Sequence, residues 1–341
     1  MSELAAARAR SQRLVGERLT DAAAAVSAVA GIQAQDAGAA LLSIRVRTTG
    51  LTRADVDRAL YEERSIVRIW AMRGTIHLVP SEDARWLVDL LAPLALRGSH
   101  RRLEQLGVPE AARPRAVRAT RDALAEHGAL TRAELMEHVA RAARVNTADQ
   151  AGAHLAMLAA LDGHVCFGEP RGGKPTYVLR DDWLGSGLMQ LAREDAVTEL
   201  ARRYAGAFAP AEVEDFASWS GLPLREARAG WSAAGISAPP PPAPPPDPPD
   251  VRLLPAFDTF LLGYRTRDAL VAPEHARRVC PGGGMVRPAV VSNGRAVGTW
   301  RRSGMRVELE PFGDEPLAAD GEVADVQRFL GRPARARSSR A

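Results

Sequence analysis

The sequence predicts a mainly helical α+β protein, for two reasons. Stretches with helical periodicity precede a β-hairpin pattern twice along the chain, and much of the last quarter of the chain reads as strand. At 341 residues, the chain is also long enough for two or three small domains with buried cores. We therefore expect modules that share one plan, followed by a β-rich unit at the C-terminus.

The composition limits what the protein can bind and where it works. The net charge is +4 at pH 7, and Lys174 is the only lysine, so nearly all positive charge is arginine. Arginine binds phosphate well through its planar fork of donors, and this modest charge permits nucleic-acid binding without requiring it. Two cysteines, no signal-peptide pattern and no apolar run of about 18 residues lead us to expect a cytoplasmic protein without membrane contact.

Residues 1–110 contain the first unit of helices followed by a hairpin. Helices are predicted over Leu4–Val15, Ala22–Ala30, Ala37–Val46 and from Thr52 to about Glu63. Asp21 and Thr52 are residue types that cap helix N-termini. From Ser65 to Pro80 the pattern changes to a period of two and is broken at Arg73-Gly74-Thr75, which predicts a hairpin. Helices followed by such a hairpin form a winged helix.

The same order recurs over residues 111–182. Helices are predicted over 116–127, from Thr131 and over 151–162, and two strands flank Arg171-Gly172-Gly173. Thr131 and Glu134 have the spacing of a capping box. A third helical set over residues 183–237 shows no evident hairpin, so we predict a partial winged helix. Residues 238–250 are predicted to be a proline-rich loop.

Residues 251–330 are predicted to be a β-rich domain. Strands are expected over Val251–Phe257 and Phe260–Tyr264, and a short helix over Gly321–Leu330 closes the domain. Asn293-Gly294 lies between two strand-like runs and is the strongest two-residue signal for a hairpin. The tail, residues 331–341, has several arginines and no acids, and we predict that it is disordered.

Two glutamines, Gln33 and Gln35, stand where the helical run over 22–30 is interrupted. If the backbone there is extended, both amides point to the same side. From this local pattern alone, the pair fits two polar residues that cap neighbouring backbone groups. We interpret the adjacent Asp36 as the cap of the following helix, with activation of a water molecule as the alternative.

Several spaced segments resemble the AlkZ/YcaQ-like winged-helix DNA glycosylase family, over roughly residues 10–330. They are Gly31-Ile32-Gln33-Ala34-Gln35-Asp36, residues 68–79 (RIWAMRGTIHLV), Leu254-Pro255-Ala256-Phe257-Asp258 and Gly298-Thr299-Trp300-Arg301. Glutamine at both polar positions of the first segment resembles the AlkZ branch, since the YcaQ branch has Asp at the second. The resemblance implies a C-shaped protein of tandem winged helices plus a small β-domain. It also implies excision of N7-alkylated purines and, in the AlkZ branch, unhooking of interstrand crosslinks.

On this resemblance, Gln33 and Gln35 become candidate catalytic residues. Glutamine has no accessible pKa and cannot act as an ordinary general base. An N7-alkylated guanine, however, carries a positive charge and leaves as a neutral base. Amide oxygens then need only stabilise the oxocarbenium-like sugar and position a water molecule. Lys174 lies in a presumed hairpin away from the motif, so we predict a monofunctional enzyme without a Schiff-base lyase step.

Arginines and aromatic residues near the hairpins are the candidates for DNA contact. They are Arg68, Trp70, Arg73, His77, Arg287, Arg295, Arg301 and Arg302. Trp70 fits a core position equally well, His77 fits an internal histidine, and the Asn293-Gly294 hairpin fits either ordinary β-structure or a probe for a DNA groove. Asp258 and Arg267 are secondary candidates that either form an ion pair, which we favour, or line the cleft.

No metal site or cofactor is predicted, because the histidines are scattered and His164-Val165-Cys166 lacks companions at ligand spacing. The alternative function is that of a non-catalytic winged-helix DNA-binding protein, either a regulator or a protein that shields lesions. A regulator normally needs a dimer seam, and the chain has no heptad segment. We therefore favour a monomeric enzyme at the nucleoid, acting on double-stranded DNA with alkylated purines.

Overall fold

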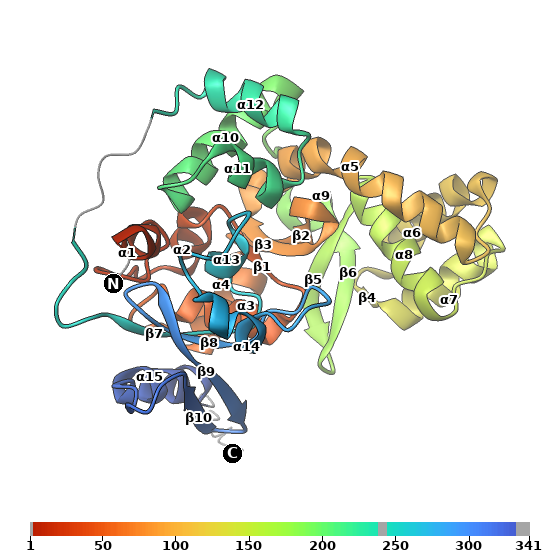
Figure 1. The fold of residues 1–341 in the computed structure, drawn as a ribbon. Helices are drawn as coiled ribbons and strands as arrows, with labels where there is room; N and C mark the ends of the chain where they lie inside the picture. Colours follow the sequence, from red (N-terminus) through yellow and green to blue (C-terminus); the bar gives the residue numbers. More distant parts are fainter. Residues whose placement is uncertain (1–2, 238–243, 332–341) are drawn as a thin grey trace, which may run out of the picture.

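The structure, a computed structural model, describes residues 3–237 and 244–331 and confirms a mixture of helices with small antiparallel sheets (Figure 1). Most of the proline-rich run and the arginine-rich tail lie outside the described residues. None of the described helices is both long enough and apolar enough to cross a bilayer. Short 3-10 turns are found at Met72–Gly74, Ser81–Asp83, Glu110–Ala112 and Pro273–His275.

The chain begins with α1 (Glu3–Ser11), and a first unit of three helices and a three-stranded sheet follows. Its elements are α2 (Ala22–Ala28), β1 (Ile32–Gln33), α3 (Ala37–Arg45), α4 (Arg53–Tyr61), β2 (Ile66–Trp70) and β3 (Ile76–Pro80). The strands are antiparallel in the order β1-β3-β2. The predicted caps are confirmed: Asp21 accepts the Ala24 N–H, and Thr52 forms a capping box with Asp55. The predicted hairpin is confirmed as β2 and β3.

A second unit has the same order of elements. It consists of α6 (Arg113–His127), β4 (Leu130–Thr131), α7 (Arg132–Ala143), α8 (Asp149–Leu161), β5 (Val165–Arg171) and β6 (Lys174–Leu179). Its strand order, β4-β6-β5, repeats that of the first unit, and the predicted capping box of Thr131 and Glu134 is present. The long helix α5 (Ala84–Gln105) joins the two units. The same succession of elements therefore occurs twice: a helix, a short strand, two helices and a hairpin.

A purely helical segment follows. It contains α9 (Arg180–Leu184), α10 (Arg193–Phe208), α11 (Val213–Ser220) and α12 (Leu224–Ala233). All of residues 183–237 are described, and no strand occurs among them, in line with the absence of a predicted hairpin. In Figure 1, α10, α11 and α12 lie above the sheet of the first unit. Their position matters for the site because α11 covers the turn of the first hairpin.

The C-terminal unit is a four-stranded antiparallel sheet with short helices. Its elements are β7 (Val251–Leu254), α13 (Thr259–Leu262), α14 (Ala276–Val279), β8 (Ala289–Ser292), β9 (Arg295–Ser303), β10 (Arg306–Pro311) and α15 (Asp320–Leu330), with strand order β10-β9-β8-β7. The Asn293-Gly294 hairpin is confirmed between β8 and β9. The strand predicted over Phe260–Tyr264 is wrong. A short continuous apolar run does not distinguish helix from strand, and the Asp258 carboxylate caps α13 by accepting the Phe260 N–H.

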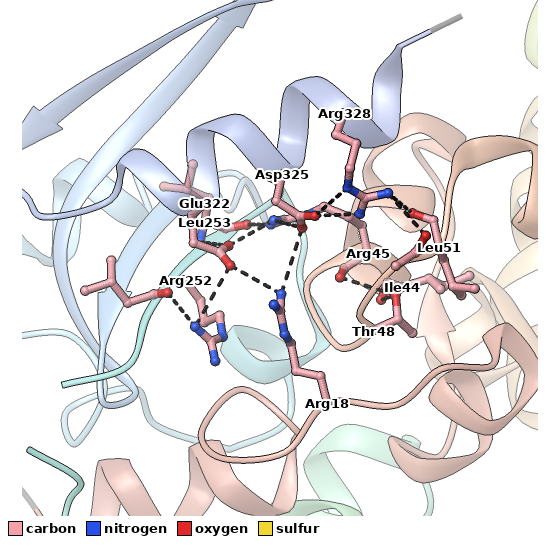
Figure 2. Close-up of polar contacts among 12 residues, drawn as sticks. Arg18, Ile44, Arg45, Thr48, Leu51, Arg252, Leu253, Glu322, Asp325 and Arg328 are labelled. Carbon is pink, nitrogen blue, oxygen red and sulfur yellow. Dashed lines mark hydrogen bonds and ion pairs between the residues drawn. The ribbon is translucent and has the colours of Figure 1, made fainter. Parts of the chain in front are cut away.

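Buried arginines near the end of α3 tie it to the C-terminal unit. Arg45, 1% exposed, donates to Glu322 at 2.9 Å and Asp325 at 3.0 Å on α15. Figure 2 shows this cluster, in which Arg18 also reaches the Glu322 carboxylate. Because a buried charge is stable only with partners, these contacts fix how the C-terminal unit sits on the first unit.

Candidate catalytic site

Gln33 and Gln35 lie on the extended segment that joins α2 to α3. Gln33 is the partner of His77 in the β1–β3 ladder, and the Ala34 N–H donates to the Ile76 carbonyl at 2.7 Å. Burial alternates along the segment: Ala34 is buried, Gln33 is half-buried and Gln35 is exposed. Both glutamines therefore leave the backbone on the side opposite Ala34, as expected for extended chain.

The glycine before the motif allows this close pairing. Gly31 has φ +103°, and a Cβ there would lie 3.2 Å from the Leu78 carbonyl oxygen. Any other residue would be strained at this φ and would press on β3. The short strand that presents Gln33 therefore depends on a glycine immediately before it.

The two amides differ in how they are held. The Gln35 Oε1 atom accepts the Ile76 N–H at 3.2 Å, so this side chain is anchored to β3. Within the described chain, no hydrogen bond is recorded to the Gln33 amide. The pair therefore offers one amide of fixed orientation and one that is free to meet a ligand.

The neighbouring Asp36 caps α3, as predicted. Its Oδ1 atom accepts the Ala39 N–H at 3.0 Å, and its backbone has the extended conformation of an N-cap. One carboxylate oxygen is thus directed at the start of the helix.

His77 and Trp70 occupy interior positions, which corrects their assignment as DNA contacts. His77 is 2% exposed, and its Nδ1 atom lies 3.0 Å from the Thr75 carbonyl. Burial lowers the pKa of His77 to about 3, so the imidazole is neutral near pH 7. Trp70 is 8% exposed and stacks on Phe167, with 4.7 Å between ring centroids. Neither ring can reach a phosphate from these positions.

The turn of the first hairpin is covered by the helical segment. Arg73 is exposed, but it donates to the Trp219 carbonyl at 2.5 Å, and Gly221 packs beside it. Any phosphate contact by Arg73 would have to share the guanidinium with this carbonyl. The sequence carries no local signal for this covering, because α11 is distant from the turn along the chain.

The Asn293-Gly294 turn is also covered, which corrects its interpretation as a probe for a DNA groove. A Cβ on Gly294 would lie 2.3 Å from the Ala5 carbonyl oxygen of α1. Asn293 is 2% exposed and donates to the Pro246 carbonyl at 3.0 Å. The turn is therefore an internal contact between the C-terminal sheet and α1.

The remaining arginine candidates lie on the C-terminal unit. Arg287, Arg301 and Arg302 are exposed, and Arg295 is half-buried. Arg301 forms ion pairs with Glu308 at 2.6 Å and Glu310 at 3.3 Å across the β9–β10 ladder. Contact of these four arginines with DNA stays a prediction.

Asp258 forms an ion pair, as favoured from the sequence, but its partner is Arg47 rather than Arg267. Its two carboxylate oxygens accept from Arg47 at 2.8 and 2.9 Å, and Ser43 donates to it at 2.6 Å. Burial alone would raise the pKa of Asp258, but the Arg47 guanidinium and the other donors hold it below its ordinary value. Arg267 instead donates to the Leu261 carbonyl at 2.6 Å. The only sequence signal for Arg47 was its place just after a buried helix.

Arg68 contacts protein on the far side of the motif. Its Nε atom donates to the Ala34 carbonyl at 3.0 Å, and its guanidinium lies over the Phe167 ring, 4.6 Å from the centroid. Arg68 lines a cavity of about 430 Å³ between α3, α4 and the β5–β6 hairpin. In the described ranges, no group of three or more His, Cys, Asp or Glu is placed to hold a metal ion.

Comparisons with known proteins agree on one family. A family model described as DNA glycosylase AlkZ-like matches residues 26–336. The curated interstrand DNA cross-link repair glycosylase of Streptomyces sahachiroi is 30% identical, over 90% of this chain and 90% of the relative. The solved structure of the Streptomyces sahachiroi DNA glycosylase AlkZ superposes with a TM-score of 0.75 at 26% identity, covering 97% of this chain and 96% of that one.

Proposed function

The chain belongs to the AlkZ-like DNA glycosylase family, and from this premise we propose that it hydrolyses the N-glycosidic bond of cationic N7-alkylated purines in double-stranded DNA. As a DNA glycosylase it releases a base from DNA. The proposal concerns which base it releases and which groups act on it.

One observation supports this substrate class: the outward side chains of the motif are two uncharged amides. Gln35 is fixed by the Ile76 N–H, and Gln33 is free within the described chain. The nearest imidazole, His77, is buried and neutral, and an Asp36 oxygen is directed at the start of α3. This set offers dipoles rather than an obvious proton donor, so it suits a leaving group that already carries positive charge.

In this mechanism the lesion supplies the leaving-group charge and the protein supplies orientation. The carbonyl end of one amide faces the positive charge that develops on the sugar as the base departs, and the other amide orients the attacking water. The alkylated purine leaves neutral, and the water oxygen forms the new bond to C1′ and loses its proton to solvent.

The mode of DNA binding is also a proposal. The arginines on the C-terminal unit, Arg287, Arg295, Arg301 and Arg302, are assigned to backbone phosphates. The name of the curated relative, an interstrand DNA cross-link repair glycosylase, supports unhooking of crosslinks by this chain as well. We further propose that it acts as a monomer at the nucleoid.

The test compares two duplexes of one sequence, containing either 7-methylguanine or uracil. Under single-turnover conditions, we expect 7-methylguanine to be released and uracil to be released about 10²–10⁴-fold more slowly, because a neutral base needs a general acid and the described residues of the motif offer no obvious one. Equal rates would contradict the proposal. Tight binding with no base released from any alkylated duplex would favour the non-catalytic alternative.

A further inference from the structure

We infer that Arg68 is a positioning residue, which holds the Ala34 carbonyl between the two glutamines and so fixes the direction of both amides. This inference rests on the proposed function of the glutamine pair. It replaces the assignment of Arg68 as a DNA contact.

The register of the sheet places Arg68 behind the motif. Arg68 pairs with Leu78, and Leu78 pairs with Ile32. Directly paired residues share a face of the sheet, and successive residues alternate between faces. Arg68 therefore lies on the face of Ala34, opposite Gln33 and Gln35, and acts on the amides only through the backbone.

The hydrogen bond from Arg68 leaves both backbone groups of Ala34 bound. The Ala34 N–H is bound to the Ile76 carbonyl at 2.7 Å, and the Ala34 carbonyl is bound to the Arg68 Nε atom at 3.0 Å. With both backbone groups held, rotation of the peptides that carry Gln33 and Gln35 is restricted. An error of about 1 Å at a reacting centre can slow a reaction about 10²-fold, so this restriction affects rate.

The second unit braces Arg68 from the other side. Its guanidinium lies over the Phe167 ring of β5, and Phe167 in turn stacks on Trp70 of β2. Within the described ranges, no carboxylate lies within 4.0 Å of the Arg68 guanidinium, although burial lowers the pKa of this group. A half-buried arginine without a carboxylate partner is costly to maintain. The Ala34 carbonyl and the Phe167 ring are therefore the specific partners of Arg68. Through them, Arg68 joins the glutamine motif of the first unit to the β5–β6 hairpin of the second unit.

The test separates positioning from DNA contact with Arg68→Lys and Arg68→Ala. We expect the single-turnover rate of 7-methylguanine release to fall about 10- to 100-fold in both, with unchanged DNA affinity and an unchanged slope of affinity against salt. Millimolar guanidinium should partly restore Arg68→Ala, because the cavity of about 430 Å³ adjoins the vacated site. Arg58→Ala, at an exposed position on α4, is the control and should show neither loss nor rescue.

Two results would overturn the inference: weaker DNA binding with a salt slope reduced by about one, as loss of a phosphate contact requires, or an unchanged rate. If Arg68→Ala does not fold, Phe167→Leu removes the brace instead and should lower the rate in the same way. Amide hydrogen exchange gives a readout independent of activity. Exchange at the Ala34 and Ile76 amides, which donate to the Ile76 carbonyl and to Gln35, should quicken in Arg68→Lys, and unchanged exchange would contradict positioning even if the wild-type protein releases no 7-methylguanine.

Discussion

Replacing Gln35 by alanine should slow the release of N7-alkylated purine by about 10²–10³-fold, the usual effect of removing one preorganised dipole from a catalytic site. DNA affinity should stay unchanged, because the proposed phosphate contacts lie on the C-terminal unit. The Gln35 side chain is exposed and its only recorded hydrogen bond within the described chain is to Ile76, so the fold should survive the change. Single-turnover base release and DNA binding, measured on the same duplex, check the prediction.

Asp36→Asn is the matched control for this experiment. Asparagine caps a helix about as well as aspartate, so α3 keeps its cap while the ionisable group is lost. We expect a rate close to that of the wild-type protein. If Asp36→Asn loses as much activity as Gln35→Ala, a carboxylate rather than the amides activates the water. Gln33→Ala should slow base release about as much as Gln35→Ala does. The double variant should lose less transition-state stabilisation than the two single variants added together, because the two amides act as a unit.

The second large effect concerns stability. Asp258→Ala leaves Arg47 charged and buried without its carboxylate, and both side chains of this pair are 0% exposed. Breaking such a pair destabilises a protein by about 3–5 kcal/mol. Urea unfolding at pH 7 measures the loss. The surface pair of Arg228 and Glu214 gives the control, and Glu214→Gln should change stability far less than Asp258→Ala does.

The same pair predicts a pH dependence of stability. The pKa of Asp258 is lower in the folded protein than in the unfolded chain, because Arg47 and its other donors outweigh burial. The unfolded chain therefore binds the proton first on acidification. The contribution of the pair is fully present above the unfolded pKa, about 4, and is lost as pH falls through the folded value. In Asp258→Asn this part of the acid-induced loss should be absent. If its stability falls with pH as steeply as that of the wild-type protein below about pH 4, Asp258 does not contribute as described.

Local signals in the sequence predicted much of the fold. The caps at Asp21 and Thr52, the capping box at Thr131 and the hairpin at Asn293-Gly294 depend on residues a few positions apart, and the structure confirms all of them. The alternation around Gln33 follows from the same kind of local rule. Local signals were not sufficient at Phe260–Tyr264, because a short apolar run fits both helix and strand.

Long-range packing decided the points that the sequence could not predict. Asp258 and Arg47 are 211 residues apart, and the sequence around either residue does not indicate that the other is its partner. Burial of the Asn293-Gly294 turn depends on α1, which is almost the whole chain away. Arginine is a residue type that often contacts DNA, but the register of β1, β2 and β3 places Arg68 on the same face of the sheet as Ala34, where it binds the Ala34 carbonyl. In each case the residue type was informative, while its partner came from the tertiary fold.

The pH dependence of the single-turnover rate on 7-methylguanine DNA tests the central claim most directly. Glutamine does not titrate, and His77, with a pKa of about 3, stays neutral across the range from about pH 5.5 to 8.5. Two amides acting on a base that already carries its charge therefore predict a flat profile. A rate that falls on acidification through this range would contradict this account, because it would show that the reaction requires a deprotonated side chain as general base.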